Sequence, residues 1–126
     1  MKLPLLSTVL AVTFAAGPVW AADGADKTAF NSNCRTCHSA KEGDNRLGPS
    51  LGNILGAKAG SQPGYPNYSQ AMKSSGVTWD EATLDKFIAN PESVIPNNNM
   101  KPFAGVPDPN VRKKIIASLK TGAGEG

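Results

Sequence analysis

The stretch Cys34-Arg35-Thr36-Cys37-His38 decides the fold of this chain. Two thiols three positions apart, followed at once by a histidine, form the attachment signature of a c-type haem. At this spacing the two sulfurs can reach both vinyl groups of one porphyrin as thioethers, and the imidazole lies under the ring centre, where it can bind iron. The sequence contains no other cysteine or histidine. It therefore predicts one haem c, attached through Cys34 and Cys37, with His38 as an iron ligand.

Three alternatives to haem attachment use the same residue types. A thioredoxin-like redox motif also contains Cys-x-x-Cys, but it belongs in a βαβ setting after a strand, and residues 29–33 (Ala-Phe-Asn-Ser-Asn) contain no β-branched run. A structural zinc site needs four ligands, usually as two pairs, whereas this chain has three crowded together. A disulfide with an incidental neighbouring histidine is the third alternative. The sequence favours haem attachment over all three.

Length and composition limit the chain to one small domain. At 126 residues it is short for two domains, and its net charge of +3 comes without the clustered lysines and arginines of a nucleic-acid binder. Thirteen glycines, ten prolines and 6% aromatic residues indicate a loop-rich chain with a thin apolar core. Such domains usually need a staple, and a covalently held haem can supply the core that the side chains do not.

The N-terminus is typical of a Sec signal peptide. A positive start precedes an apolar run over residues 3–16, and small residues flank a cleavage point between Ala21 and Ala22. The apolar run is shorter than the ~20 residues of a membrane-spanning helix, so an uncleaved anchor is the disfavoured alternative. We expect residues 1–21 to be cleaved on export to the periplasm, where haem c is attached, and residues 22–126 to form a domain without stable membrane insertion.

Helical periodicity and capping residues predict an all-α domain with three main helices. The first is expected from an Asp23 or Asp26 cap to about Cys34. The second follows a Thr78–Glu81 capping box and ends before Pro91, and its apolar face consists of Leu84, Phe87 and Ile88.

The third main helix is expected to begin at Asp108-Pro109, an N-cap followed by proline at the first helical position. Its predicted inward stripe is Val111, Ile115, Ser118 and Leu119, and its water-facing positions are Arg112, Lys113, Lys114 and Lys120. A short helix is predicted over residues 68–75 with Asn67 as its cap, ended by Gly76 in the left-handed conformation. Residues 91–107 are expected to be extended.

The three methionines of the chain are the candidates for a second axial ligand. Met1 leaves with the signal peptide, and Met72 lies mid-helix, where packing is the simpler role. Met100 lies in the long loop after Pro96, which can drape over the far haem face, so it is the predicted ligand. Two strong axial ligands close the iron to O₂ and peroxide, and a soft thioether favours Fe(II). The expected chemistry is outer-sphere electron transfer and not enzymatic catalysis.

The sequence resembles the class I cytochromes c over nearly the whole of residues 22–126. The likeness rests on Phe30 before the haem motif and on an ordered series of later motifs: Gly48-Pro49-Ser50-Leu51, Tyr68-Ser69-Gln70-Ala71, Gly76-Val77-Thr78-Trp79, the segment from Leu84 to Asn90-Pro91, Met100-Lys101-Pro102-Phe103-Ala104-Gly105, and a terminal Ile-Ala-x-Leu helix. The resemblance implies the cytochrome c fold, with three main helices, short helices and long loops wrapped around one covalently attached haem.

The resemblance also implies roles for individual residues. His38 and Met100 would be the axial ligands, and the Pro49 carbonyl would accept the other ring N–H of His38. Tyr68 and Trp79 would donate hydrogen bonds to a buried haem propionate. Phe30 would pack where the first and last helices cross.

The implied function is that of a soluble, monomeric one-electron carrier between membrane or periplasmic redox proteins: a bc-type complex, terminal oxidase, reaction centre or dehydrogenase. Mitochondrial members of the family carry lysines around the haem edge. This chain has few lysines at those positions, since Glu92 and Ser93 follow Asn90-Pro91. This departure motivates an alternative, the dedicated electron acceptor of a periplasmic dehydrogenase such as methanol dehydrogenase. A haem enzyme or gas sensor with a labile sixth ligand is a third hypothesis, supported only by the asparagine-rich loop around Met100.

Overall fold

The computed structural model describes residues 20–122, with side chains from Gly24 onward. Within this range the regular structure is helical, without a named strand, and the one isolated bridge pairs Lys58 with Thr78. The predicted all-α fold class is therefore confirmed. The helices in chain order are α1 (Trp20–Asn33), α2 (Gln70–Ser74), α3 (Glu81–Ala89), α4 (Pro91–Val94) and α5 (Pro109–Thr121).

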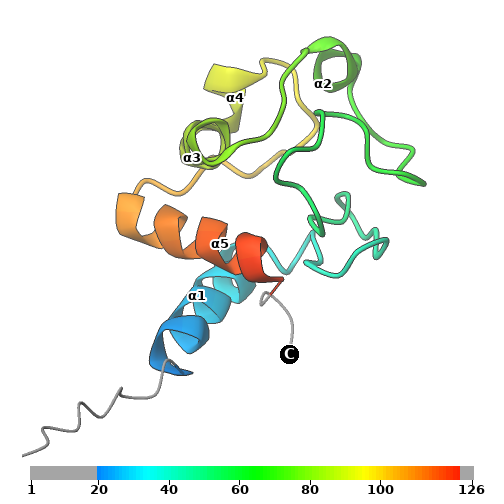
Figure 1. Ribbon diagram of the computed structural model, residues 1–126. Helices are drawn as coiled ribbons and strands as arrows, with labels where there is room; N and C mark the ends of the chain where they lie inside the picture. Colours follow the sequence, from blue (N-terminus) through cyan, green and yellow to red (C-terminus); the bar gives the residue numbers. More distant parts are fainter. Residues whose placement is uncertain (1–19, 123–126) are drawn as a thin grey trace, which may run out of the picture.

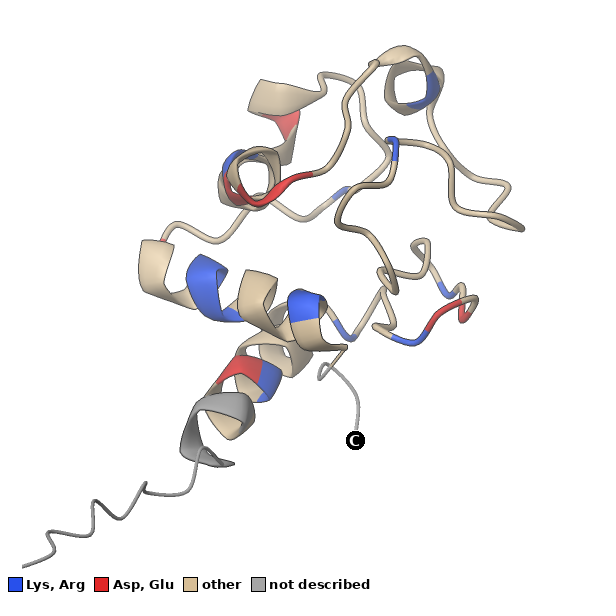
Figure 2. Ribbon diagram, viewed as in Figure 1, with Lys and Arg blue, Asp and Glu red and all other residues tan. Residues whose placement is uncertain are grey.

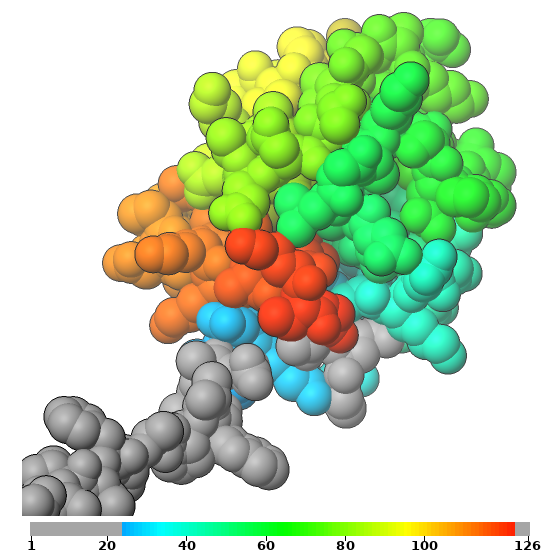
Figure 3. Space-filling view, in the orientation of Figure 1, coloured from blue at the N-terminus to red at the C-terminus, as the bar shows by residue number. Residues whose placement is uncertain are grey.

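The first and last helices cross and pack against each other (Figure 1). Phe30 on α1 and Ile115 on α5 are both wholly buried in the same apolar cluster, as expected for a packing role of Phe30. The space-filling view shows α5 lying across α1, with the middle of the chain stacked above the pair (Figure 3). Helix α3 packs against both α5 and α4. This crossing fixes where the haem motif leaves α1.

The prediction that helix α1 begins at an aspartate cap was wrong, because the helix already includes Trp20. Asp23 and Asp26 therefore lie inside the helix. Of the predicted signal peptide, residues 1–19 lie outside the described range, so its cleavage stays a prediction. None of the helices in the described part of the chain has the length and hydrophobicity needed to cross a bilayer.

The N-cap of helix α3 lies two residues after the predicted one. Asp80, not Thr78, is the N-cap: its carboxylate accepts the Thr83 N–H at 2.7 Å, and the Thr83 hydroxyl accepts the Asp80 N–H at 2.9 Å. The bridge between Thr78 and Lys58 keeps the chain extended here, with the Trp79 N–H donating to the Ala57 carbonyl at 2.9 Å, so the helix does not begin at Trp79. The predicted inward face is confirmed, since Leu84, Phe87 and Ile88 are buried.

The two short helices differ from the prediction. Helix α2 is confined to Gln70–Ser74, because the Ser69 hydroxyl caps it by accepting the Met72 N–H at 3.0 Å. Asn67 is not the cap. The segment after α3 was expected to be extended, but Pro91 occupies the first turn of α4, where a missing N–H costs nothing.

Helix α5 begins as predicted, with Asp108 as N-cap and Pro109 at the first position. Ile115, Ser118 and Leu119 are buried, whereas Lys113, Lys114 and Lys120 are exposed. The prediction for Arg112 was wrong. Its side chain is only 12% exposed and bonds to Asp85 on α3 at 2.7 Å, and it also donates to the carbonyls of Val106 and Pro107 at 2.9 and 2.8 Å.

Candidate functional site

A cavity of about 480 Å³ opens between the haem motif, the middle loops and helices α3 and α5. This volume is within the usual range of cofactor sites. Every site residue predicted from the sequence lines it: Cys34, Cys37, His38, Pro49, Tyr68, Trp79 and Met100. Residues separated by more than sixty positions thus converge on one space.

The haem motif lies on the turn that follows α1. The Cys34 N–H donates to the Phe30 carbonyl at 2.8 Å, so Cys34 continues the helical hydrogen bonding. The N–H groups of Cys37 and His38 both donate to the Cys34 carbonyl, at 3.1 and 2.9 Å. This tight turn brings the two sulfurs and the imidazole to one wall of the cavity.

Both cysteines are free thiols in the structure. Cys34 is half-buried and Cys37 is exposed. Burial, with a smaller contribution from the Cys37 charge, raises the pKa of Cys34 to about 12. The Cys34 thiol is therefore protonated at neutral pH, which argues against a redox-active thiolate at this position.

His38 is buried, with 6% of its surface exposed, and its orientation is fixed by one hydrogen bond. Its Nδ1 lies 2.7 Å from the Pro49 carbonyl oxygen. A carbonyl can only accept, so Nδ1 carries the proton and Nε2 keeps its lone pair. Burial lowers the pKa of His38, opposed by the bond to Pro49, and this favours the neutral form that binds metals.

The loop that carries Pro49 is tied back to the haem motif by main-chain bonds. The Gly48 N–H donates to the Cys37 carbonyl at 2.7 Å, and the Leu51 N–H donates to the Ser39 carbonyl at 2.8 Å. A Cβ at Gly48 would overlap the His38 ring, lying 2.7 Å from Nδ1 and closer still to Cε1. Glycine is therefore needed at this position for the backbone to lie against the imidazole.

Both methionines of the described chain reach the cavity. Met100 is half-buried and enters from the loop between α4 and α5, and Met72 is half-buried and enters from α2. Each also packs against the apolar core. The structure thus brings Met100 and His38 to the same cavity, and it adds Met72 as a second thioether there.

Two polar donors on the cavity wall have no acceptor among the described residues. Trp79 is buried, and no described residue accepts a hydrogen bond from its indole N–H. The Tyr68 oxygen accepts the Gln62 N–H at 3.2 Å, whereas its own O–H lacks an acceptor among the described residues. Burial raises the pKa of Tyr68, so it remains a donor. Unsatisfied donors at a cavity suit a ligand that carries anionic oxygens.

The rest of the wall is mainly apolar. The inward faces of α3 and α5 supply Leu84, Phe87, Ile88, Ile115 and Leu119, and the loop before them adds Leu51 and Ile54. The helical periodicity predicted these side chains as core, and they also form the lining of the site. A wide apolar wall with two unpaired donors and two sulfurs fits a flat apolar disc that carries carboxylates.

The zinc alternative finds no support in the described residues, because no three His, Cys, Asp or Glu side chains lie together where they could hold a metal ion. The charges are also sparse at the site. Of the residues that line the cavity, Lys58 and Lys101 are the basic ones. Basic positions are spread over α2, α5 and the loops, with acidic positions on α3 and α4 among them (Figure 2).

Comparisons with known proteins agree with this site. The chain is 49% identical to cytochrome c2 of Rhodomicrobium vannielii over 96 residues, which is 73% of each protein. It is 45% identical to cytochrome c2 iso-2 of Magnetospirillum molischianum over 97 residues, 77% of this chain and 98% of that protein. The chain is a class I c-type cytochrome.

A solved structure gives the same answer for the fold of this cytochrome. Cytochrome cH from Methylobacterium extorquens superposes with a TM-score of 0.71 at 41% identity, covering 79% of this chain and 97% of that one. No protein-family model matches the chain. Membership of the family makes this cytochrome an electron carrier and not an enzyme, and it implies a haem c.

Proposed function

We propose that this cytochrome is a soluble periplasmic one-electron carrier whose haem is attached through Cys34 and Cys37 and whose iron is ligated by His38 and Met100. The observation that carries the proposal is the convergence of these four side chains on one cavity, with His38 already turned by Pro49 so that Nε2 is free. When bound, the haem supplies a one-electron Fe(II)/Fe(III) couple.

The protein's own residues set the conditions for that couple. The Nδ1–H of His38 donates a hydrogen bond to the Pro49 carbonyl, so Nε2 would be free to bind the haem iron. Met100 would supply a thioether as the other ligand, which would favour the reduced state. Tyr68 and Trp79 would donate hydrogen bonds to a haem propionate. With both ligand positions taken by side chains, the iron would be closed to an inner-sphere substrate and the protein would transfer electrons by an outer-sphere route.

Met100 is preferred to Met72 as the ligand because Met72 is held within α2, while Met100 lies in a loop between helices. The matched test is Met100→Ala against Met72→Leu in the haem-loaded protein. We expect Met100→Ala to abolish the weak sulfur-to-iron absorption band of the ferric protein and to lower the reduction potential, and Met72→Leu to retain both. The reverse pattern would assign the ligand to Met72.

The same experiment tests the carrier role. Wild-type ferrous protein should not bind CO near neutral pH, because the sixth position is taken, and Met100→Ala should bind it. Rapid CO binding by the wild-type protein would favour the sensor or enzyme hypothesis. Export is tested separately, by the N-terminal sequence of the protein recovered from periplasm, which we expect to begin at Ala22.

A second candidate partner follows from the charges at the cavity mouth. Only Lys58 and Lys101 bring positive charge to the lining, and nearby Arg35 and Lys41 are exposed. So weak a basic rim suits a dedicated dehydrogenase as well as a bc-type complex, reaction centre or terminal oxidase. Reduction rates with a bc-type complex and with a periplasmic methanol dehydrogenase, at low and high salt, distinguish the two. A faster, strongly salt-dependent reaction with the bc-type complex would remove the second candidate.

A further inference from the structure

The loop that carries Met100 lacks the main-chain bonds that hold ordinary loops. Residues 96–105 make no backbone–backbone hydrogen bond within the described structure. The loop is anchored again only at Val106, whose N–H donates to the Ile88 carbonyl at 2.8 Å. Whatever fixes the backbone of Met100 must therefore come from side chains.

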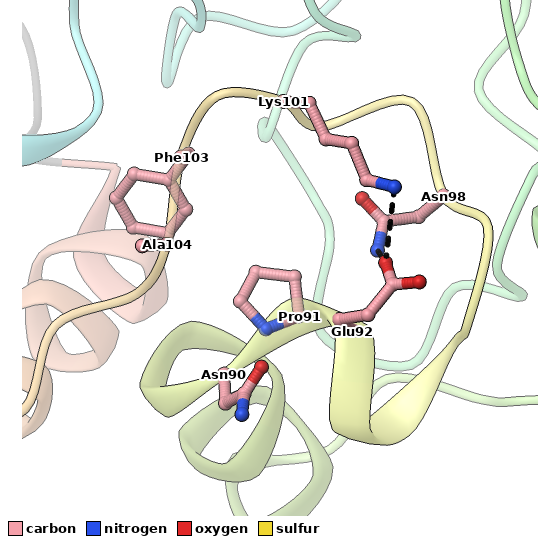
Figure 4. A pocket seen from close by; sticks show the side chains of 7 residues that line it. All are labelled: Asn90, Pro91, Glu92, Asn98, Lys101, Phe103 and Ala104. Carbon is pink, nitrogen blue, oxygen red and sulfur yellow. Dashed lines mark hydrogen bonds and ion pairs between the residues drawn. The ribbon is translucent and has the colours of Figure 1, made fainter.

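One carboxylate reaches into this loop from α4. The two oxygens of Glu92 accept different hydrogen bonds: Oε1 accepts the Asn97 N–H at 2.9 Å, and Oε2 accepts the Asn98 side-chain NH₂ at 3.1 Å. The Lys101 ammonium lies 3.6 Å from Oε2. Figure 4 shows the Asn98 and Lys101 side chains both directed toward the Glu92 carboxylate. The three residues line a small cavity of about 190 Å³.

Asn98 passes this anchoring on to Met100. It is only 3% exposed, and both polar groups of its side chain are satisfied. Its NH₂ group donates to Glu92 and to the Ile95 carbonyl, the latter at 2.9 Å, and its Oδ1 accepts the Met100 N–H at 2.8 Å. A continuous chain of hydrogen bonds therefore runs from α4 through Glu92 and Asn98 to the backbone of Met100.

We propose that Glu92 and Asn98 are positioning residues for the axial methionine, and that they set how readily Met100 leaves the iron. This inference rests on the proposed function, because it takes Met100 as the sixth ligand. Neither residue lines the larger cavity that would hold the haem. Each acts by holding the loop backbone. The loop then loses less conformational entropy when the Met100 sulfur occupies the ligand position.

Imidazole competition measures this directly, because imidazole binds the ferric haem only when Met100 has left. In the haem-loaded protein, Glu92→Gln and Asn98→Ala are each expected to bind imidazole about tenfold more tightly than wild type, the effect of losing one hydrogen bond in a charged network. The double variant should gain much less than the product, because both residues belong to one chain of bonds. Unchanged affinities in both single variants would overturn the proposal.

Glu81→Gln is the matched control for charge. It removes one exposed carboxylate, which pairs with Lys120 at 2.6 Å between α3 and α5, far along the chain from the Met100 loop. We expect wild-type imidazole affinity. An effect equal to that of Glu92→Gln would mean that net charge, and not positioning, controls Met100.

Failure of this inference is distinguishable from failure of the ligand assignment. If Met100→Ala binds imidazole no more tightly than wild type, Met100 is not the ligand and the proposed function fails. If Met100→Ala binds it much more tightly while Glu92→Gln and Asn98→Ala do not, only the positioning role fails.

Hydrogen exchange on the wild-type protein needs no variant that must fold. The amides of Asn97 and Met100 donate to Glu92 and Asn98, whereas no described residue accepts from the amides of Asn99 and Lys101. We expect the first pair to exchange at least about tenfold more slowly than the second. Equal rates for the two pairs would contradict the hydrogen-bond chain.

Discussion

The two walls of the cavity that carry the proposed axial ligands are built in opposite ways. On the His38 wall, main-chain bonds tie the turn after α1 to the loop that carries Pro49, through Gly48 and Cys37 and through Leu51 and Ser39. On the Met100 wall, residues 96–105 make no such bond in the described structure, and side chains hold the loop. A backbone scaffold tolerates most substitutions, whereas a side-chain scaffold exposes the ligand to single mutations. The imidazole side should therefore be the stiff one and the thioether side the adjustable one.

The largest expected loss of stability comes from Gly105, where the Met100 loop returns to α3. Its φ is +119°, and an added Cβ would overlap the Ala89 carbonyl oxygen and lie 2.7 Å from the carbonyl carbon. Both partners are backbone and cannot rotate away. Gly105→Ala should lower the free energy of unfolding by ~3 kcal/mol or more, measured by denaturant titration of the haem-loaded protein.

The control for this change is Gly24→Ala. Gly24 lies in α1, and no heavy atom lies within 4 Å of an added Cβ. This variant should be unchanged or up to ~1 kcal/mol more stable, since alanine favours a helix. Equal stability of Gly105→Ala and Gly24→Ala would show that the Met100 loop can move away from α3 without cost.

On the opposite wall, Gly48→Ala should cost ~1–3 kcal/mol in the same titration. The added methyl meets the His38 ring and not a main-chain carbonyl. A displacement of the ring would lengthen the bond to Pro49, so the ring-proton NMR signals of His38 should shift. A larger loss than that of Gly105→Ala would reverse the comparison between the two walls.

Arg112 tests the far end of the Met100 loop. Its guanidinium joins Asp85 to the carbonyls of Val106 and Pro107, three directions that one lysine ammonium cannot reproduce. Arg112→Lys should lower the free energy of unfolding by ~1–2 kcal/mol in denaturant titration. The adjacent Lys113→Gln, at an exposed position, should have no measurable effect. Matching losses in the two variants would contradict a specific role for Arg112.

The smallest expected effect lies in α5, which serves both walls. Ser118 is wholly buried, and its hydroxyl has no hydrogen-bond partner in the described structure. Ser118→Ala removes that unpaired group and should raise the free energy of unfolding by ~1 kcal/mol, with unchanged imidazole affinity. Thr121→Ala on the same helix, whose hydroxyl donates to the Ala117 and Ser118 carbonyls, should give no such gain. A loss of stability for Ser118→Ala would indicate that the hydroxyl finds a partner in solution.

The sequence predicted local features of this molecule well. The inward face of α3 was predicted from the spacing of apolar residues within that one helix. The prediction is confirmed, since Leu84, Phe87 and Ile88 are buried. The orientation of His38 by Pro49 was implied by the family resemblance, and the 2.7 Å contact agrees with it. These features need only short-range geometry or a motif that the whole family shares.

The errors arose where distant segments decide between local options. Thr78 and Asp80 could both cap α3, and the bridge of Thr78 to Lys58 settles the choice. Arg112 stands on the polar side of its helix by periodicity, yet Asp85 and the loop before α5 cover it. The bonds from Glu92 to Asn97 and Asn98 required knowing that the loop folds back over α4. No local sequence pattern predicts such contacts between distant segments.

The position of Trp79 in the cavity wall gives this cytochrome an optical reporter of its own folding. The chain has two tryptophans, and Trp20 precedes the proposed cleavage point. The exported protein would then carry Trp79 as its single tryptophan, beside the haem and 4.9 Å from the Phe87 ring. With a haem in the cavity, its fluorescence would be quenched by energy transfer to the porphyrin while the wall is closed and would recover when α3 separates from the cavity. Emission intensity therefore follows the opening of this wall without any added label.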